Sequence, residues 1–237
     1  MSRIPGEATP TAGLFASLVD RRRRGVLLTA LGVVLALAAF AGLASEVLEG
    51  DVFAMDRVII AVFRAPGHPD LMIGPPWVQE AARDITALGG FTVLTLVSLV
   101  TTLLLVLHRR RAQALVFAAT VILAQLVTEL LKAFIARPRP ELSLHHDWVY
   151  ASSFPSGHAL MTPVVYLTLA AVIAHGERSR SLRDTVTLCA GGLIVAVGVS
   201  RVYLGVHWPT DVLAGWALGI AIALAASVAV ERAAAAR

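Results

Sequence analysis

The sequence predicts an all-α membrane protein, a polytopic bundle of six transmembrane helices. Of the 237 residues, 57% are hydrophobic and only 15% are charged, whereas an ordinary globular domain carries about 25% charged residues. The mean hydropathy is +0.75. Apolar runs of 16 to 22 residues recur between charged breaks. This composition excludes a disordered chain, a coiled coil and a small secreted domain, and a single cysteine, Cys189, allows neither an intramolecular disulfide nor a cysteine metal cluster.

Each apolar run approaches the roughly 20 residues that a helix needs to cross a bilayer. The predicted spans are residues 25–45, 87–107, 113–134, 159–175, 185–200 and 212–230. The first run is too long for the apolar region of a cleaved signal peptide. We therefore expect one membrane domain over residues 25–230, with tails at residues 1–24 and 231–237.

The basic residues predict the orientation of the spans. If the N-terminus is cytoplasmic, 13 of the 20 basic residues lie in cytoplasmic segments and seven lie on the other side. Cytoplasmic loops of membrane proteins carry an excess of Lys and Arg. Both termini are therefore predicted to be cytoplasmic, in a protein of the inner (plasma) membrane.

The first outer segment, residues 46–86, is long for a loop. Its apolar stretch is interrupted by Asp56 and Arg57, a pattern that favours a helix lying in the membrane interface. After it, prolines are expected to prevent regular structure. These are Pro66, Pro69, Pro75 and Pro76.

The end of the third span carries the first cluster of candidate site residues. Lys132 is the only lysine in the chain, and Arg137 and Arg139 follow it. A lysine provides a compact charge that can meet a phosphate oxygen, but a lysine at a helix end can also extend to the interface without any ligand. Arg137 fits either a contact with a lipid headgroup or a surface anchor.

The start of the fourth span carries the second cluster. Ser156 and Gly157 precede it, and His158 falls in its first turn. A serine there can cap the helix, and the free N–H groups of a helix N-terminus bind anions. The sequence leaves open whether Ser156 only caps the helix or also helps to bind an anion.

The connection between the fifth and sixth spans carries the third cluster. Arg201 opens it, and His207 and Asp211 are four residues apart, with Pro209 placed to begin the last helix. This spacing lets the carboxylate accept a hydrogen bond from one imidazole nitrogen and leaves the other nitrogen as a nucleophile or base. The alternative is that His207 and Asp211 form only an ion pair at the membrane interface.

All three clusters fall on the same predicted membrane face. Together they bring three cations, two histidines and one carboxylate to helix ends, a set suited to a phosphate group. One histidine would attack phosphorus and the other would protonate the leaving oxygen, although spacing alone does not assign the two. Because no carboxylate cluster accompanies them, a two-metal mechanism is disfavoured.

These residues resemble the three-part signature of the type 2 phosphatidic acid phosphatases, the lipid phosphate phosphatases related to vanadium haloperoxidases. The resemblance implies a six-helix phosphatase that uses no metal and no cofactor. It makes His207 the nucleophile, Asp211 the residue that orients it, and His158 the acid. It also implies that phosphate is bound by a further set, Lys132, Arg139, Arg201, Ser156 and the Gly157 N–H group.

The expected partner is a lipid phosphate in the membrane, not a nucleic acid. The resemblance favours undecaprenyl diphosphate, with phosphatidylglycerophosphate, phosphatidate and lipid A phosphate as other candidates. A lipid phosphotransferase would use the same phosphohistidine, and a lipid-phosphate binding or translocating protein would keep the anion site without turnover. The intact His207–Asp211 pair argues against binding alone, because binding requires only the cations.

Other polar residues have less specific roles. Glu129 is one turn before the lysine and is expected to form a buried ion pair with it. Asp84 and Thr86 are expected to cap the second span, with a place in the site as the alternative. His145 and His146 are adjacent, and we expect them to be solvated rather than to bind a metal.

Overall fold

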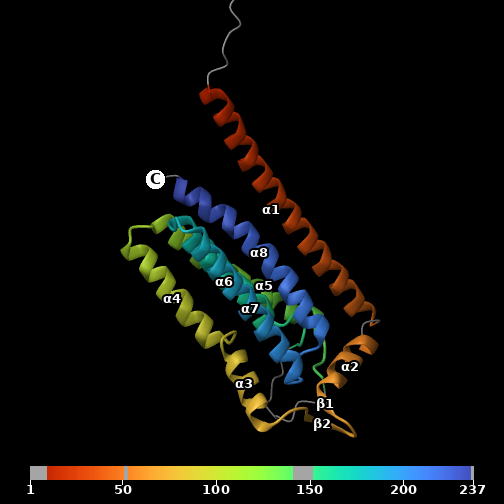
Figure 1. Ribbon diagram of the computed structural model, residues 1–237. Coiled ribbons are helices and arrows are strands. Elements are labelled where there is room, and N and C mark those ends of the chain that lie inside the picture. Colours follow the sequence, from red (N-terminus) through yellow and green to blue (C-terminus); the bar gives the residue numbers. More distant parts are fainter. Residues whose placement is uncertain (1–9, 51–52, 141–151, 236–237) are drawn as a thin grey trace, which may run out of the picture.

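The computed structural model describes residues 10–50, 53–140 and 152–235. These residues form eight α-helices and one two-stranded antiparallel hairpin (Figure 1). The helices are α1 (Pro10–Glu49), α2 (Phe53–Val62), α3 (Pro76–Ala87), α4 (Phe91–Leu107), α5 (Arg111–Ile135), α6 (Gly157–Gly176), α7 (Arg180–Tyr203) and α8 (Pro209–Ala235). The hairpin pairs β1 (Arg64–Ala65) with β2 (His68–Met72).

Five of these helices are individually long and apolar enough to cross a membrane. They are α1 over Arg23–Glu49, α5, α6, α7 and α8. Helices α3 and α4 make a sixth span when taken together, across a bend of 42°. The predicted all-α, membrane-spanning fold is therefore confirmed, and the sixth span is a broken one.

The second predicted span, residues 87–107, differs most from the structure. Helix α4 begins only at Phe91, with Gly90 in extended backbone as its N-cap. The helical residues before it, α3, belong to the segment that was expected to be a loop. Two consecutive glycines, Gly89 and Gly90, interrupt the helix because glycine favours helical backbone least after proline.

The outer segment is more regular than expected. Helix α2 confirms the predicted helix, but a hairpin and α3 follow it, so the expectation that the prolines exclude regular structure is wrong. Pro76 occupies the first position of α3, where a helix makes no use of the missing N–H group. Helix α1 also begins at Pro10, within the predicted tail.

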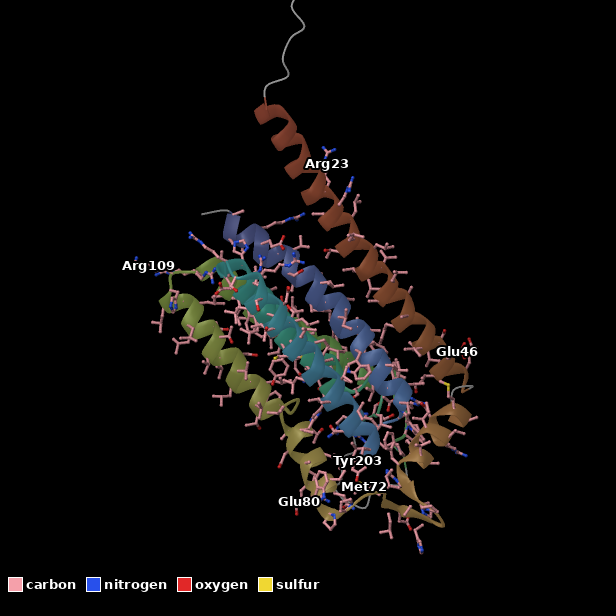
Figure 2. The ribbon with its side chains drawn as sticks, viewed as in Figure 1. Arg23, Glu46, Met72, Glu80, Arg109 and Tyr203 are labelled. Carbon is pink, nitrogen blue, oxygen red and sulfur yellow. The ribbon has the colours of Figure 1, made fainter. Side chains whose placement is uncertain are left out.

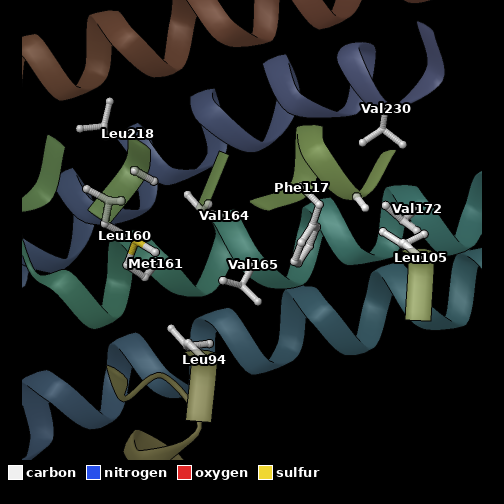
Figure 3. Close-up of a cluster of buried hydrophobic side chains, with 12 residues drawn as sticks. Leu94, Leu105, Phe117, Leu160, Met161, Val164, Val165, Val172, Leu218 and Val230 are labelled. Atoms are coloured by element: carbon white, nitrogen blue, oxygen red, sulfur yellow. The ribbon is translucent and has the colours of Figure 1, made fainter. Parts of the chain in front are cut away.

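Helix α6 lies at the centre of the bundle. It packs against α5, α7 and α8, and α1 lies along the outer side of α8 (Figure 1). The core cluster between α4, α5, α6 and α8 includes Phe117, Leu160, Val164 and Val165, all fully buried (Figure 3). This packing fixes the position of α6 and therefore of the residues in its first turn.

The two ends of the bundle differ in what they carry. Arg109, beside the start of α5, lies at the end opposite to Tyr203, Met72 and Glu80 (Figure 2). The C-termini of α5 and α7 and the N-termini of α6 and α8 share the end that carries Tyr203. The three predicted clusters are located at these four helix ends.

Candidate active site

A buried histidine–carboxylate pair lies at the start of α8. His207 Nδ1 is 3.4 Å from Asp211 Oδ2, and the Trp208 backbone N–H donates to the same oxygen across 2.9 Å. His207 and Asp211 are 2% and 0% exposed. The predicted pair is therefore present, and the carboxylate holds the imidazole through Nδ1.

The other imidazole nitrogen, Nε2, faces Arg139, whose Nη1 atom is 3.4 Å away. Burial lowers the pKa of His207 to about 4; the nearby Arg201 and Arg139 also lower it, while the hydrogen bond and charge of Asp211 raise it. The ring is therefore uncharged at neutral pH. A neutral ring held at Nδ1 presents a lone pair at Nε2, which is what a nucleophile requires.

His158 occupies the first turn of α6, as predicted. It lies close enough to His207, Arg201, Lys132 and Arg139 to interact with each of them electrostatically. A Cβ atom added to Gly89 would lie 2.5 Å from Val197 Cγ1 and 3.4 Å from His158 Cδ2. Glycine at the break between α3 and α4 therefore lets α7 pack closely there, next to His158.

The three predicted cations also converge. Lys132 lies in the last turn of α5 and Arg201 in the last turn of α7, and Arg139 interacts electrostatically with both. Burial lowers the pKa of Arg139, which the charge of Asp211 raises in part. Within the described residues, the buried Arg201 Nε atom has no hydrogen-bond partner. Gathered cations with a buried unsatisfied donor favour an anionic ligand.

Ser156 and Gly157 form the N-terminus of α6. Ser156 Oγ accepts from the Ala159 N–H across 3.5 Å, which confirms the cap, and the Ser156 N–H donates to the Asp211 carbonyl across 3.0 Å. A Cβ atom on Gly157 would lie 3.3 Å from Lys132 Nζ. Glycine at this position therefore lets the lysine approach the helix start.

Two of the less specific expectations are corrected. Lys132 Nζ is 3.9 Å from Glu129 Oε1, but the Glu129 side chain is 57% exposed, so the pair is not buried. Thr86 Oγ1 accepts from Arg201 Nη1 across 3.2 Å. Thr86 therefore faces the site and does not cap the second span, whose N-cap is Gly90. Asp84 is exposed.

The question of a metal site at His145 and His146 lies outside the described residues. Among the residues that the structure describes, no three His, Cys, Asp or Glu side chains come together as a metal site would require. Independence from metal stays a prediction.

The sequence did not predict the role of two residues beside the histidine–carboxylate pair. Arg137 Nη1 lies 2.5 Å from Asp211 Oδ1, and its Nη2 atom lies 2.6 Å from Asp56 Oδ2. Arg137 is only 4% exposed, so the surface-anchor interpretation is wrong. The available signal was Asp56, the one acidic residue of α2, which lies one turn before Ile60; both are fully buried.

A groove of about 570 Å³ leads away from the site between α4 and α5. Its walls are mostly apolar and include Leu94, Leu99, Ile122 and Leu126. Lys132, Gly157 and His158 line one part of it. An apolar groove that meets a cationic cluster suits a molecule with a hydrocarbon tail and an anionic head.

The fold and the site together define a membrane-spanning protein in which two histidines and three cations gather at one end of the helix bundle. Residues 113–234, just over half of the chain, match the PAP2 superfamily. The chain belongs to the PAP2 superfamily.

Its relatives include phosphatidylglycerophosphatase B of Bacillus subtilis (strain 168), which is 34% identical over 152 residues, covering 63% of this chain and 74% of the relative. Undecaprenyl-diphosphatase of Sulfolobus acidocaldarius is 34% identical over 127 residues, covering 51% and 56%. A crystal structure of a transmembrane PAP2 type phosphatidylglycerolphosphate phosphatase from Bacillus subtilis matches with a TM-score of 0.72 and 30% identity, over 82% of this chain and 93% of that one. The expected membership in a family of membrane phosphatases is confirmed.

Proposed function

We propose that this chain is a membrane lipid phosphatase that hydrolyses a phosphomonoester or diphosphate through a phosphohistidine at His207. The observation that carries the proposal is the buried His207–Asp211 pair, in which Asp211 holds Nδ1 and Nε2 lies 3.4 Å from Arg139 Nη1. Binding of an anion requires the cations but not a neutral histidine held by a carboxylate.

The first half of the reaction follows from these positions. His207 Nε2 attacks phosphorus, and the bond between phosphorus and the leaving oxygen breaks. The negative charge of the bound phosphate offsets the surrounding cations and favours a protonated His158, which gives its proton to the leaving oxygen. Asp211 keeps the proton on Nδ1 and stabilises the positive charge that develops on the ring. Lys132, Arg139 and Arg201 neutralise the charge on the equatorial oxygens.

In the second half, water attacks the phosphohistidine and inorganic phosphate leaves. His158, now neutral, takes a proton from that water, so the two histidines return to their starting states. Ser156 and the Gly157 N–H group complete the phosphate site. No metal or cofactor takes part in either half.

The substrate is a phosphorylated lipid whose tail occupies the α4–α5 groove. The groove supports this choice because its apolar walls run up to Lys132 and His158. Undecaprenyl diphosphate is the substrate that the family resemblance favours, and the named relatives act on phosphatidylglycerophosphate or undecaprenyl diphosphate. We propose these two as the first substrates to test, before phosphatidate and lipid A phosphate.

The site opens on the extracytoplasmic face of the inner membrane, with both termini in the cytoplasm. The uneven distribution of basic residues supports this orientation. Arg109, one of the predicted cytoplasmic residues, lies at the end of the bundle away from the site (Figure 2).

The decisive experiment measures phosphate release by the purified protein in detergent with excess EDTA. The four lipids are compared, with His207→Ala beside the wild type. We expect release that survives EDTA, is lost in the variant, and accompanies an acid-labile phosphoprotein. A phosphorylated alcohol formed at the expense of phosphate would indicate a transferase, and activity retained by folded His207→Ala would overturn the catalytic role.

A further inference from the structure

A buried ion-pair network extends behind the catalytic carboxylate, away from the phosphate site. Arg137 connects Asp211 to Asp56 through its two terminal nitrogens, at 2.5 and 2.6 Å. Thr210 completes the network. It accepts from Arg137 Nη1 across 2.7 Å, and it donates to Asp56 from its backbone N–H at 3.0 Å and from its hydroxyl at 2.7 Å.

Each oxygen of Asp211 therefore has an assigned partner. Oδ1 accepts from Arg137, and Oδ2 accepts from the Trp208 N–H and faces His207 Nδ1. A carboxylate held at both oxygens cannot rotate about its terminal bond. This arrangement fixes which oxygen meets the imidazole and at what angle.

Arg137 is itself held by its backbone. Its N–H donates to Ser152 Oγ across 3.0 Å, and its carbonyl accepts from the Ser153 N–H across 2.8 Å. Its guanidinium carbon lies 5.6 Å from the centre of the Trp208 ring. The Arg137 guanidinium is thus fixed in place between Asp56 of α2 and Asp211 of α8.

The charges of the network have a second effect. Two carboxylates and one guanidinium, with side chains exposed by 2% or less, carry a net charge of −1. Without Asp56, Arg137 and Asp211 would neutralise each other. Asp56 therefore preserves negative charge beside His207 when the ring becomes cationic. Burying ions is costly and is weak evidence for stability, so a role in positioning is the better reason for the network.

We propose that Asp56 and Arg137 are positioning residues, which hold Asp211 so that its Oδ2 atom stays aligned with His207 Nδ1 during phosphoryl transfer. This inference rests on the proposed function, because it assumes that His207 is the nucleophile. It assigns a role in the reaction to α2, a helix outside the spans and outside the residues that match the family.

The test is a double-mutant cycle on the steady-state and single-turnover kinetics. Asp56→Asn keeps the size of the side chain and removes its charge. We expect kcat and the rate of phosphohistidine formation to fall at least about tenfold with little change in KM, since the cations that bind phosphate are untouched. Asp211→Asn is expected to lower kcat and the rate of phosphohistidine formation further than Asp56→Asn does. The double variant is expected to be no slower than Asp211→Asn, because residues that act as a unit are non-additive.

The acid limb of the activity profile provides a readout that a purely structural role would not move. The groups that face His207 are Arg201 from α7, Arg139 from the connection between α5 and α6, His158 from α6 and Asp211 from α8. Removing the negative charge of Asp56 from behind Arg137 makes the ring harder to protonate. The acid limb is therefore expected to shift to lower pH in Asp56→Asn.

Asp184→Asn is the matched control. It removes an aspartate from an exposed pair with Arg180, in which the two side chains are 64% and 87% exposed, and it is expected to leave kcat unchanged. If the losses in kcat of Asp56→Asn and Asp211→Asn add in the double variant, and His207→Ala is inactive, the positioning role is overturned but the proposed function stands. An active His207→Ala would overturn the proposed function itself. If Asp56→Asn does not fold, Arg137→Lys replaces it in the double-mutant cycle. This variant keeps the positive charge but loses the planar guanidinium that contacts two carboxylates, and additive losses would again overturn the positioning role.

Discussion

Arg201 Nη1 donates a hydrogen bond to Thr86 Oγ1 across 3.2 Å, and this bond joins the end of α7 to the end of α3. The Nε atom of the same guanidinium is buried without a partner among the described residues. The hydrogen bond to Thr86 therefore orients the remaining N–H donors of the Arg201 guanidinium. A short helix outside the predicted spans thus helps to shape the proposed phosphate site.

Thr86→Ala is expected to weaken phosphate binding. A typical hydrogen bond contributes about 1 kcal/mol, which corresponds to about a fivefold increase in KM and in the inhibition constant of inorganic phosphate. Thr86→Ser keeps the hydroxyl and should behave as the wild type. An inhibition constant that is the same in Thr86→Ala would show that Arg201 does not need this partner.

Gly157→Ala is expected to stabilise the folded protein and yet to slow its hydrolysis of the substrate. In a helix, alanine is more favourable than glycine by about 1 kcal/mol. Its Cβ atom, however, would lie 3.3 Å from Lys132 Nζ and push the ammonium away from the start of α6. We expect kcat/KM to fall about three- to tenfold while the thermal midpoint in detergent does not fall. Gly191→Ala is the control, since a Cβ atom there meets nothing within 4 Å, and its activity should not change.

His207 should make the protein less stable in mild acid. Burial lowers the folded-state pKa of His207 to about 4, whereas an unfolded histidine has a pKa of about 6.5. As pH falls from about 6.5 to 4, the unfolded chain binds a proton at this position that the folded chain excludes. Stability from this residue is therefore present above about pH 6.5 and decreases through that window.

The measurement is the thermal midpoint in detergent between pH 7 and 4. His207→Asn removes the titrating group, so its midpoint should fall less with acid than that of the wild type. Parallel curves for the two proteins would show that folding does not depress the pKa of this histidine.

Filling the α4–α5 groove should affect only substrates with tails. Ile122 lines the groove and is 60% exposed. Ile122→Trp is expected to raise KM about tenfold for a long-chain lipid phosphate and to leave hydrolysis of a short, water-soluble phosphate ester unchanged. Leu188→Trp, at a 75% exposed position of α7, is the control. Equal effects of both variants on the lipid substrate would place the tail elsewhere.

The spans and the convergence of the candidate site residues were predictable because each rests on a local pattern. Runs of apolar residues reveal helices in lipid regardless of tertiary packing, and the spacing of His207 and Asp211 is that of one helical turn. The three clusters also fall at the ends of predicted spans, so their convergence required only that the spans alternate in direction.

The Asp56–Arg137–Asp211 network was not predictable because it depends on tertiary structure. In the sequence, Asp56 is a polar interruption in an apolar stretch and Arg137 is one of seven basic residues on the predicted outer side. The packing of α2 against α8 brings Asp56 close to Asp211, and the chain that follows α5 places Arg137 against both. The break at Gly89 and Gly90 was missed for a similar reason, since the apolar pattern continues through α4 and hides the change of direction.

The position of Asp56 has a consequence for the biosynthesis of the protein. Helix α2 emerges from the ribosome before any of the residues that match the family, and α8 emerges after all the other spans. Asp211, the proposed catalytic carboxylate, can be secured only when α8 inserts beside a helix made at the start. A nascent chain that contains Lys132 and His158 but not α8 is therefore expected to be inactive, and hydrolysis is expected to begin only once α8 has been inserted.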